Sequence, residues 1–207
     1  MEDVLNLYEQ PYNPARPVVC FDERPCQLTG EIVTPIPMKP GKVFRQNYHY
    51  ERNGTCVTML AYQPLTGKRL VSVRKQKTKK DYALFMKSLD AAYPEAEKII
   101  LIQDNLNTHN PSSFYETFPP EKAFRLSRRF RMCYTPKKAS WLNMAEIEFS
   151  ALAKQCLTRR LGNLATFSEE VYAWTRERNR KKTTVSWQFT KNDARKKFDR
   201  FYKDVRN

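Results

Sequence analysis

Apolar residues gather in two short runs that each lead into an aspartate. Residues 18–21 precede Asp22, and residues 99–103 precede Asp104. Apolar runs of this length, bounded by polar residues, predict buried strands. Since side chains alternate between the two faces of a strand, each aspartate shares a face with the apolar residue two positions before it. We therefore expect each strand to end in a carboxylate beside its packed face.

The two aspartates predict a metal site. In sheets with parallel strands, ligands collect outside the carboxyl ends of the strands, where Asp22 and Asp104 would meet if their strands were parallel neighbours. Two carboxylates at one place repel each other unless a cation neutralises them.

Between these runs the pattern predicts an antiparallel meander. Residues 44–50 and 55–62 are strand-like, and Asn53-Gly54 between them is typical of a type I′ hairpin turn. A further short strand is expected over residues 69–73.

Helical periodicity replaces the strand pattern from residue 79 onward. Apolar residues recur at helical spacing over residues 79–93, and Pro94 ends that run. A helix start is expected at Asn110-Pro111-Ser112 and a strand over residues 130–135. Two more helices are predicted, over residues 143–161 and 168–180, and the basic tail 191–207 carries aromatic residues that we expect to dock.

This order of elements predicts an α/β fold: a ribonuclease H-like mixed five-stranded sheet, with an antiparallel meander plus parallel strands, flanked by helices. With 207 residues the chain is expected to form one domain. We divide it into an N-terminal lead (1–15), a ribonuclease H-like core (16–162) and a C-terminal helical extension packed on the core (163–207).

Charge adds a partner to this picture. The chain carries 37 Lys and Arg against 22 Asp and Glu, a formal net charge of +15, which favours nucleic acid as the partner. No apolar stretch approaches the ~20 residues that span a bilayer, so we expect a cytoplasmic protein without a membrane partner. Cys20, Cys133 and Cys156 lie in apolar patterns and are expected in the core, and structural zinc is not expected.

The predicted helix after the last strand offers a third acid. Glu146 and Glu148 flank its apolar stripe on opposite sides, so periodicity alone does not choose between them.

Three blocks of the sequence resemble the catalytic blocks of DDE transposases in the mariner-related branch of bacterial insertion sequences. They are Val19-Cys20-Phe21-Asp22-Glu23, Gln103-Asp104-Asn105-Leu106-Asn107-Thr108-His109 and Ser140-Trp141-Leu142-Asn143-Met144-Ala145-Glu146. The family's Leu-Asn-x-x-Glu motif selects Glu146 over Glu148. The spacing from Asp104 to Glu146 exceeds that of mariner-like members, and we expect the extra residues in a loop around residues 119–129.

The resemblance implies a site and an activity. Asp22, Asp104 and Glu146 would be the catalytic acids and would hold two Mg²⁺ or Mn²⁺ ions. Asn105, His109 and Asn143 would orient them through hydrogen bonds. The implied activity is DNA cleavage and strand transfer on double-stranded element ends and a target, with TA as the family's target and a homodimer as its active form.

Such transposases carry helix-turn-helix domains ahead of the core, and only about fifteen residues precede the first strand here. We therefore expect a catalytic domain without its usual DNA-binding domains. Two alternatives stay open: a ribonuclease H-like nuclease that cuts without joining, and a non-catalytic DNA-binding remnant.

Clustered cations are the expected DNA contacts, because phosphate binding dominates protein–DNA affinity. A cluster immediately ahead of the Glu146 helix is the preferred place for DNA near the metals, and Trp141 is expected to pack rather than stack on a base. The DNA-binding candidates are Arg74, Lys75, Lys77, Arg128, Arg129, Arg131, Lys137 and Lys138.

Overall fold

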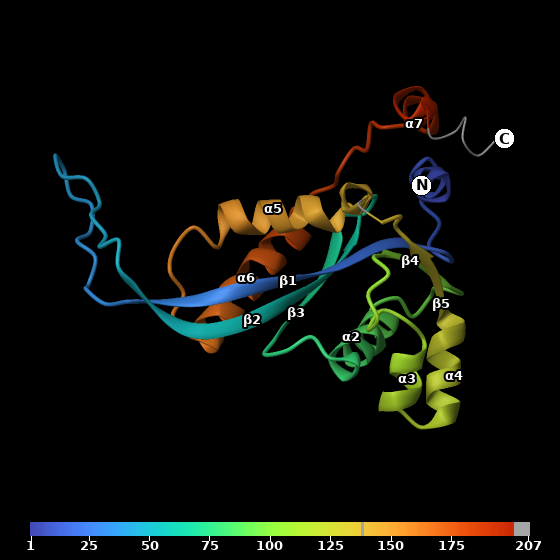
Figure 1. Ribbon diagram of the computed structural model, residues 1–207, viewed down its shortest axis with the longest axis horizontal. Helices are drawn as coiled ribbons and strands as arrows, with labels where there is room; N and C mark the ends of the chain where they lie inside the picture. Colours follow the sequence, from blue (N-terminus) through green and yellow to red (C-terminus); the bar gives the residue numbers. More distant parts are fainter. Residues whose placement is uncertain (138, 201–207) are drawn as a thin grey trace.

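The computed structural model describes residues 1–137 and 139–200. Its described strands form one mixed sheet in the order β3-β2-β1-β4-β5 (Figure 1). β2 pairs antiparallel with both β1 and β3, whereas β4 pairs parallel with both β1 and β5. The predicted five-stranded sheet of ribonuclease H type is confirmed. The strands are β1 (Val18–Glu31), β2 (Tyr50–Gln63), β3 (Lys68–Arg74), β4 (Ile99–Gln103) and β5 (Phe130–Tyr134).

Helices cover both faces of the sheet. One hydrophobic cluster joins the sheet to α1 (Glu2–Tyr8), α5 (Ala145–Gln155), α6 (Leu164–Arg180) and α7 (Lys191–Lys197). A second cluster joins the opposite face to α2 (Lys79–Ala91), α3 (Ser112–Thr117) and α4 (Pro120–Arg129). A short 3₁₀ helix, Ser140–Leu142, leads into α5. No helix among the described residues is long and apolar enough to cross a membrane.

The alternation of side chains along β1 places its residues as the pattern predicts. Cys20 belongs to the cluster beneath α5, and Phe21 to the cluster beneath α2, and both are fully buried. In β4, Ile102 lies on the α5 face and Leu101 on the α2 face. The residues that follow Cys20 and Ile102 by two positions, the aspartates, therefore emerge on the α5 face.

The Asn53-Gly54 pair is not a hairpin turn, and that prediction is wrong. Both residues lie within the continuous strand β2, and the pairing with β1 shifts register between Gln27 and Thr29 at this point. Gly54 has φ +98°, the left-handed geometry that a glycine supplies in a bulge as readily as in a turn. β1 continues to residue 31 and pairs with β2 on both sides of the pair, so the chain needs no turn there.

The actual connection between β1 and β2 is a long arm, residues 32–49, which extends away from the body of the molecule (Figure 1). It contains two isolated bridges in place of the strand predicted over residues 44–50. Apolar side chains are unusually exposed on it: Ile32, Val33, Ile36, Met38, Val43, Phe44 and Tyr48.

Two further expectations need correction. Residues 120–129 form helix α4 instead of a loop, with Pro120 at its first position, where the missing N–H of proline does no harm. α5 ends at Gln155, six residues before the predicted end.

The basic tail docks through α7, where Ala194 is buried and Arg195 pairs with Glu2. Residues 201–207 lie outside the described residues.

Candidate active site

The sheet brings Asp22 and Asp104 to adjacent strands. β1 and β4 pair in parallel, and the last pair of their register joins Cys20 to Ile102. Each aspartate lies two positions beyond that pair, and β4 ends at Gln103, just before Asp104. β1 does not end at Asp22 as expected but continues beside β2, with Asp22 opposite Leu60. Asp22 thus sits where β1 loses its parallel neighbour, which opens one side of the strand.

Asn143 brings Glu146 to the same edge. Its side-chain amide donates to the carbonyl oxygen of Phe21 (2.8 Å), the residue before Asp22, and its own carbonyl accepts from the N–H of Glu146 (3.1 Å). Its amide oxygen also accepts from the N–H of Ala145 (3.2 Å) at the start of α5. The buried Asn143 therefore ties the first turn of α5 to the strand segment that carries Asp22.

The surroundings of Asp22 oppose its ionisation. Burial, with smaller contributions from the carboxylates of Glu146 and Asp104, raises the pKa of its carboxyl to about 6, against lowering contributions from the N–H of Glu23 and from His109. That N–H donates to Oδ1 of Asp22 at 2.7 Å. Negative charge on Asp22 is therefore destabilised by its own burial and by two neighbouring acids.

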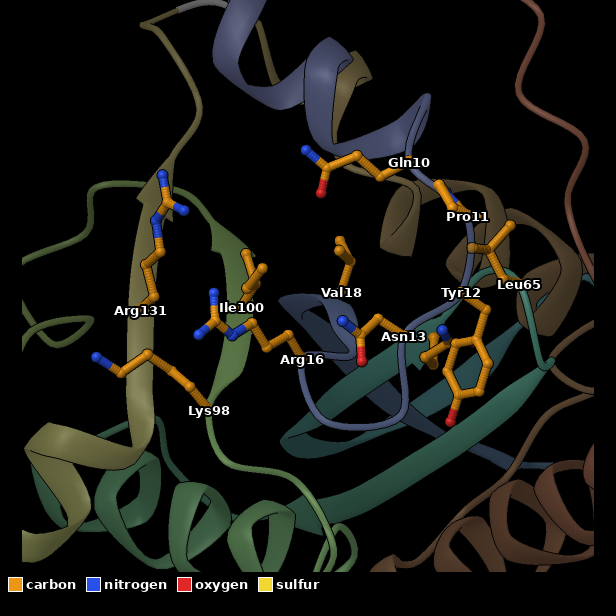
Figure 2. Close-up of a pocket in the computed structure, with 11 residues that line it drawn as sticks. Gln10, Pro11, Tyr12, Asn13, Arg16, Val18, Leu65, Lys98, Ile100 and Arg131 are labelled. Atoms are coloured by element: carbon orange, nitrogen blue, oxygen red, sulfur yellow. The ribbon is translucent and has the colours of Figure 1, made fainter.

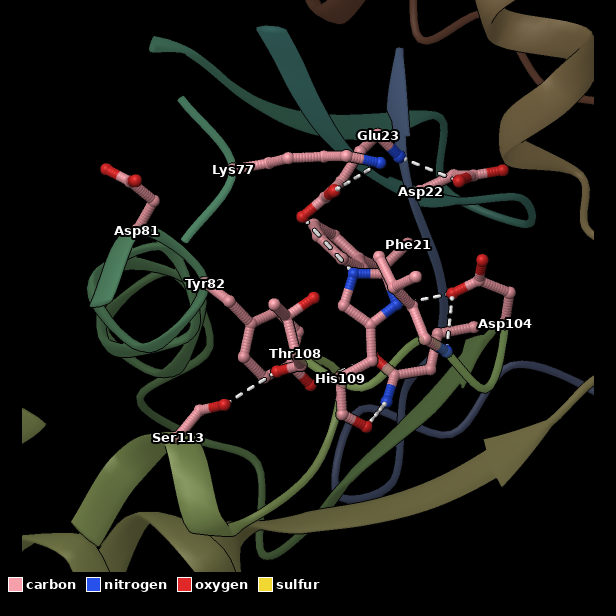
Figure 3. A network of polar contacts seen from close by, with 12 residues as sticks. Phe21, Asp22, Glu23, Lys77, Asp81, Tyr82, Asp104, Thr108, His109 and Ser113 are labelled. Atoms are coloured by element: carbon pink, nitrogen blue, oxygen red, sulfur yellow. Dashed lines mark hydrogen bonds and ion pairs between the residues drawn. The ribbon is translucent and has the colours of Figure 1, made fainter. Parts of the chain in front are cut away.

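His109 stands between two carboxylates (Figure 3). Its Nδ1 contacts Oδ1 of Asp104, and its Nε2 lies 3.2 Å from Oε1 of Glu23. The side chains of His109 and Glu23 are almost fully buried, whereas that of Asp104 is 48% exposed. Lys77 approaches Glu23 from the solvent side, with its Nζ 4.0 Å from Oε2. The histidine thus links the aspartate at the end of β4 to the glutamate next to Asp22.

The two carboxylates set the charge of His109. Burial alone would lower its pKa, but Asp104 and Glu23 outweigh burial and raise it to about 9. The hydrogen bond from His109 in turn lowers the pKa of Asp104, with help from Lys77. At neutral pH the imidazole of His109 is therefore protonated beside Asp104.

Packing fixes the imidazole in place. Its ring stacks on Tyr82 of α2, with centroids 5.0 Å apart, and meets the edge of Phe21 at 5.2 Å. Gln103 donates to the carbonyl oxygen of His109 (2.9 Å) and accepts from the hydroxyl of Tyr82 (2.9 Å). These bonds hold the loop after β4 at Gln103 and at His109, and they therefore fix how Asp104 faces His109.

Glu23 was missed by the sequence interpretation as a member of this site. Its oxygens are buried without a hydrogen-bond partner among the described residues, and only the ion pairs with His109 and Lys77 compensate its charge. The signal available in the sequence was the pair Asp22-Glu23, since adjacent strand residues face opposite sides of the sheet. A charged residue on the α2 face of a buried strand requires a partner there.

Glu148 has a structural role that separates it from Glu146. It is fully buried and pairs with the equally buried guanidinium of Arg69 and with Arg178, whose Nη2 lies 2.8 Å from Oε1. Burial alone would raise the pKa of Glu148, but the two arginines lower it. Glu146, two residues earlier, is exposed on the side of the acids. The ion pairs of Glu148 join α5 to β3 and α6.

Asn105 and Trp141 differ in their surroundings. The side chain of Asn105 is exposed and makes none of the hydrogen bonds found among the described residues. Trp141 packs against Trp187, with ring centroids 6.4 Å apart, and against Phe189 at 5.3 Å. Packing therefore accounts for Trp141, as expected.

The expected basic cluster ahead of α5 is divided between the two ends of the sheet. Arg128, Arg129 and Arg131 lie at the start of β5, whereas Asp104 follows the end of the parallel strand β4. Arg129 is also occupied, because it donates to Asp90 (2.5 Å) and to the carbonyl oxygen of Tyr93 (2.9 Å). These three arginines therefore do not lie beside the acids, which corrects the expected placement.

Cations on the acidic edge come from other segments. Lys77 contacts Glu23, and Lys75 is exposed just before it. Arg74 donates to the hydroxyl of Ser72 (2.9 Å) in β3. Lys137 is exposed after the end of β5, and Lys138 lies outside the described residues.

The donor set suits a hard divalent cation. Oδ1 of each aspartate is engaged, by Glu23 in one case and by His109 in the other, and no hydrogen bond among the described residues engages Oδ2 of either. Carboxylate oxygens are the ligands that Mg²⁺ and Mn²⁺ prefer. In the described part of the chain, no group of three or more His, Cys, Asp or Glu side chains is arranged so that it could hold a metal ion.

Fold and site together define a class of protein. A mixed sheet in the order 3-2-1-4-5, with one aspartate within β1, one just after its parallel neighbour β4 and a glutamate on the helix α5, is the architecture of a ribonuclease H-like nuclease domain. The family model described as DDE superfamily endonuclease matches residues 17–168. The chain belongs to this family.

Solved structures show the same fold. The chain superimposes on the Mos1 transposase paired-end complex with left transposon end with a TM-score of 0.59 at 12% identity, covering 87% of this chain and 55% of that chain. The Mos1 mariner paired-end complex with Mn gives 0.58 at 13%, with the same coverages. The Mos1 strand transfer complex gives 0.55 at 13%, with 85% and 50% covered. The chain thus spans about half the length of these transposases. No curated protein sequence matches it.

Proposed function

We propose that this chain is a transposase catalytic domain that cleaves DNA phosphodiester bonds with divalent metal ions and joins the resulting strands. The proposal is supported by the parallel pairing of β1 and β4, which carries Asp22 and Asp104 two positions beyond the pair Cys20–Ile102, and by the bond from Asn143 that ties the start of the Glu146 helix to β1. A family of endonucleases and a fold shared with transposase–DNA complexes support it.

The three carboxylates would hold two Mg²⁺ or Mn²⁺ ions. Bound ions would supply Lewis-acid activation of a water or 3′-hydroxyl nucleophile and would stabilise the leaving oxygen. The chain's own contribution is to position the ligands. Asn143 fixes the approach of Glu146 to β1, and His109 engages one oxygen of Asp104 so that the other is presented to the ion.

Double-stranded DNA is the proposed substrate, as element ends and as target. Lys77, Lys75 and Arg74 follow β3 on the acidic edge, and Lys137 follows β5 there. These cations would bind phosphates close to the acids, and the binding would weaken steeply with salt. The net charge of +15 adds long-range attraction.

A homodimer is the proposed active form. The arm, residues 32–49, exposes apolar side chains such as Ile36, Met38 and Phe44, which are 59%, 74% and 53% exposed. Exposed apolar groups gathered on one projecting segment are typical of a protein interface. Removal of the arm should leave a monomer in sedimentation analysis at concentrations where the full chain is dimeric.

Nicking of supercoiled plasmid with Mg²⁺ or Mn²⁺ tests the chemistry. We expect the native chain to nick, and we expect Asp104→Asn and Glu146→Gln to lose that activity while keeping salt-sensitive DNA binding. Cleavage without joining of a labelled oligonucleotide end to a target plasmid would indicate the nuclease alternative. Metal-independent binding with no cleavage by the native chain would indicate a non-catalytic DNA-binding protein.

A further inference from the structure

A cationic cavity of about 510 Å³ opens at the edge of the sheet opposite the acids (Figure 2). Lys98 precedes β4, Arg131 is the second residue of β5, and Arg16 lies just before β1, so all three come from the starts of parallel strands. Asp22 and Asp104 lie toward the other ends of β1 and β4. The cavity is therefore separate from the proposed catalytic edge.

The three cations are held by backbone pairing and are poorly neutralised. The carbonyl oxygen of Ala15 accepts from the N–H groups of Glu97 (2.8 Å) and Lys98 (3.2 Å), which fixes the segment carrying Arg16 beside the start of β4. Among the described residues, Lys98 and Arg131 take part in no ion pair. Arg16 has only a loose, exposed contact with Glu97 at 3.7 Å. No acidic residue lines the cavity, so it favours an anion.

Gln63 adds a buried hydrogen-bond donor to the cavity wall. The residue is 1% exposed, and its amide oxygen accepts from the hydroxyl of Thr66 (2.7 Å) and from the Thr66 N–H. These bonds fix the orientation of the amide, and its Nε2 has no partner among the described residues. A buried donor without a partner is costly, and a ligand acceptor in the cavity would satisfy it.

The side of the cavity away from the cations has a different character. Figure 2 shows Arg131, Lys98 and Arg16 toward one side and Tyr12 and Leu65 toward the other. Tyr12 is 46% exposed and Leu65 is 48% exposed, so both present apolar surface to a ligand. A ligand that matches this wall has an anionic end and a flat apolar end joined by polar groups, which is the composition of a nucleotide.

We propose that this cavity binds one nucleotide of a single-stranded nucleic acid, with its phosphate among Arg16, Lys98 and Arg131 and its base against Tyr12 and Leu65. Bases within a duplex are stacked and paired, so they cannot enter a concave site of this size. An unpaired strand can present its bases to an aromatic side chain and its backbone to cations. The binding goes beyond the proposed cleavage reaction and requires no metal ion.

Fluorescence anisotropy with a short oligodeoxythymidylate of about five nucleotides tests the proposal. The measurement is made in EDTA at low salt, so that failure of the cleavage chemistry cannot affect it. The variant Lys98→Gln/Arg131→Gln should weaken binding by about 10-fold or more, because two phosphate contacts are lost. The control Lys39→Gln/Lys42→Gln removes two exposed lysines from the distant arm and should bind within about 2-fold of the native chain. Equal weakening by both variants would show a general charge effect and would overturn the proposal.

Tyr12→Ala separates a nucleotide site from a bare phosphate site. It should weaken single-strand binding by about 5-fold or more, since base stacking on an aromatic ring is lost, and leave binding of a blunt-ended DNA hairpin unchanged. Unchanged single-strand binding in Tyr12→Ala would overturn the nucleotide assignment, as would displacement of the oligonucleotide by inorganic phosphate as readily as by thymidine monophosphate. Unchanged melting temperatures in the variants would show that the losses are not caused by unfolding.

Discussion

The side chain of Asn143 and the backbone of Phe21 form a buried hydrogen bond of 2.8 Å that joins the loop before α5 to strand β1. Asp22 follows Phe21 directly, and the N–H of Glu146 bonds back to the carbonyl of Asn143. One amide therefore sets the relative position of two acids that lie more than a hundred residues apart in sequence. This accounts physically for an asparagine three positions before the glutamate.

Replacement of Asn143 by alanine should separate positioning from stability. The buried carbonyl of Phe21 would lose its donor, at a cost of ~1–3 kcal/mol in the free energy of unfolding. Because Glu146 would no longer be fixed against β1, plasmid nicking by the folded variant should also fall by about 10-fold or more. Nicking is compared well below the melting temperature of the variant, so that both chains are folded.

The matched control is Asn179→Ala. Asn179 makes a similar pair of amide bonds with the backbone of Arg69 (2.8 and 2.9 Å), in a region away from the acids. It should lose comparable stability and keep its nicking rate. An equal loss of nicking in both variants would mean that Asn143 acts only through global stability.

Glu146 and Glu148 should respond in opposite ways to the same substitution. Glu148→Gln leaves the buried Arg69 without its carboxylate, and removal of one partner of a buried ion pair costs ~3–5 kcal/mol. Glu146→Gln removes an exposed carboxylate and should leave the melting temperature almost unchanged while nicking is lost. Thermal unfolding and plasmid nicking on both variants test the pair, and a catalytic loss without a stability loss in Glu148→Gln would contradict the assignment.

The ion pairs of Glu148 also imply an acid-sensitive fold. Its folded-state pKa is lowered by Arg69 and Arg178, so the unfolded chain binds the proton more readily. The stability it contributes is therefore present above the unfolded-state pKa and is lost as pH falls through the lower folded-state value. Native chain should show this acid-side loss in denaturant unfolding, and Glu148→Gln should lack it.

The sequence predicts the parts of the site that depend on local pattern. Period-two alternation places Asp22 on the face of Cys20, because a strand fixes that alternation, whereas Asp104 lies just beyond the end of β4. The helix period of the sequence could not choose between Glu146 and Glu148, because the choice depends on Arg69 in β3 and Arg178 in α6. Only tertiary packing brings these cations to Glu148.

Turn chemistry failed where strand pairing overrode it. Asn53-Gly54 satisfies the local requirement of a type I′ turn, but β1 extends to Glu31 and pairs with β2 on both sides of these two residues, and the positive φ of Gly54 serves a bulge. The position of Arg131 also depends on the topology. Arg131 is close to α5 in sequence, but it lies at the start of β5, whereas α5 follows the other end of that strand.

His109 should be needed for activity because it orients Asp104. Substitution by glutamine removes the imidazole that contacts both Asp104 and Glu23, and it leaves Glu23 buried without its main partner. We expect a loss of about 10- to 100-fold in nicking, as is typical when a residue that orients a metal ligand is removed. His49 in the exposed arm provides the control, and His49→Gln should nick at the native rate. Native-level nicking by His109→Gln would contradict the positioning role.

The charge of Asp22 should make the metal-free fold less stable as pH rises. Its folded-state pKa is about 6, above its ordinary value of 3.8, because burial and the carboxylates of Glu146 and Asp104 oppose ionisation. The stability contributed by the protonated form is present below the unfolded-state pKa and is lost as pH rises through the folded-state pKa. In EDTA, Asp22→Asn should therefore be more stable than the native chain at pH ~7, by roughly 1–3 kcal/mol, and this difference should vanish near pH ~4.

Divalent ions should reverse this order. A cation bound among the acids favours ionised Asp22, so Mg²⁺ or Mn²⁺ should raise the melting temperature of the native chain, with a smaller effect on Asp22→Asn. NaCl at equal ionic strength serves as the check on ionic strength, and the exposed Asp3→Asn serves as the matched control, because it removes a carboxylate away from the site and should respond to metal as the native chain does. An Asp22→Asn chain that is less stable than the native chain in EDTA would show that Asp22 contributes to the fold and that its burial is not held for a cation.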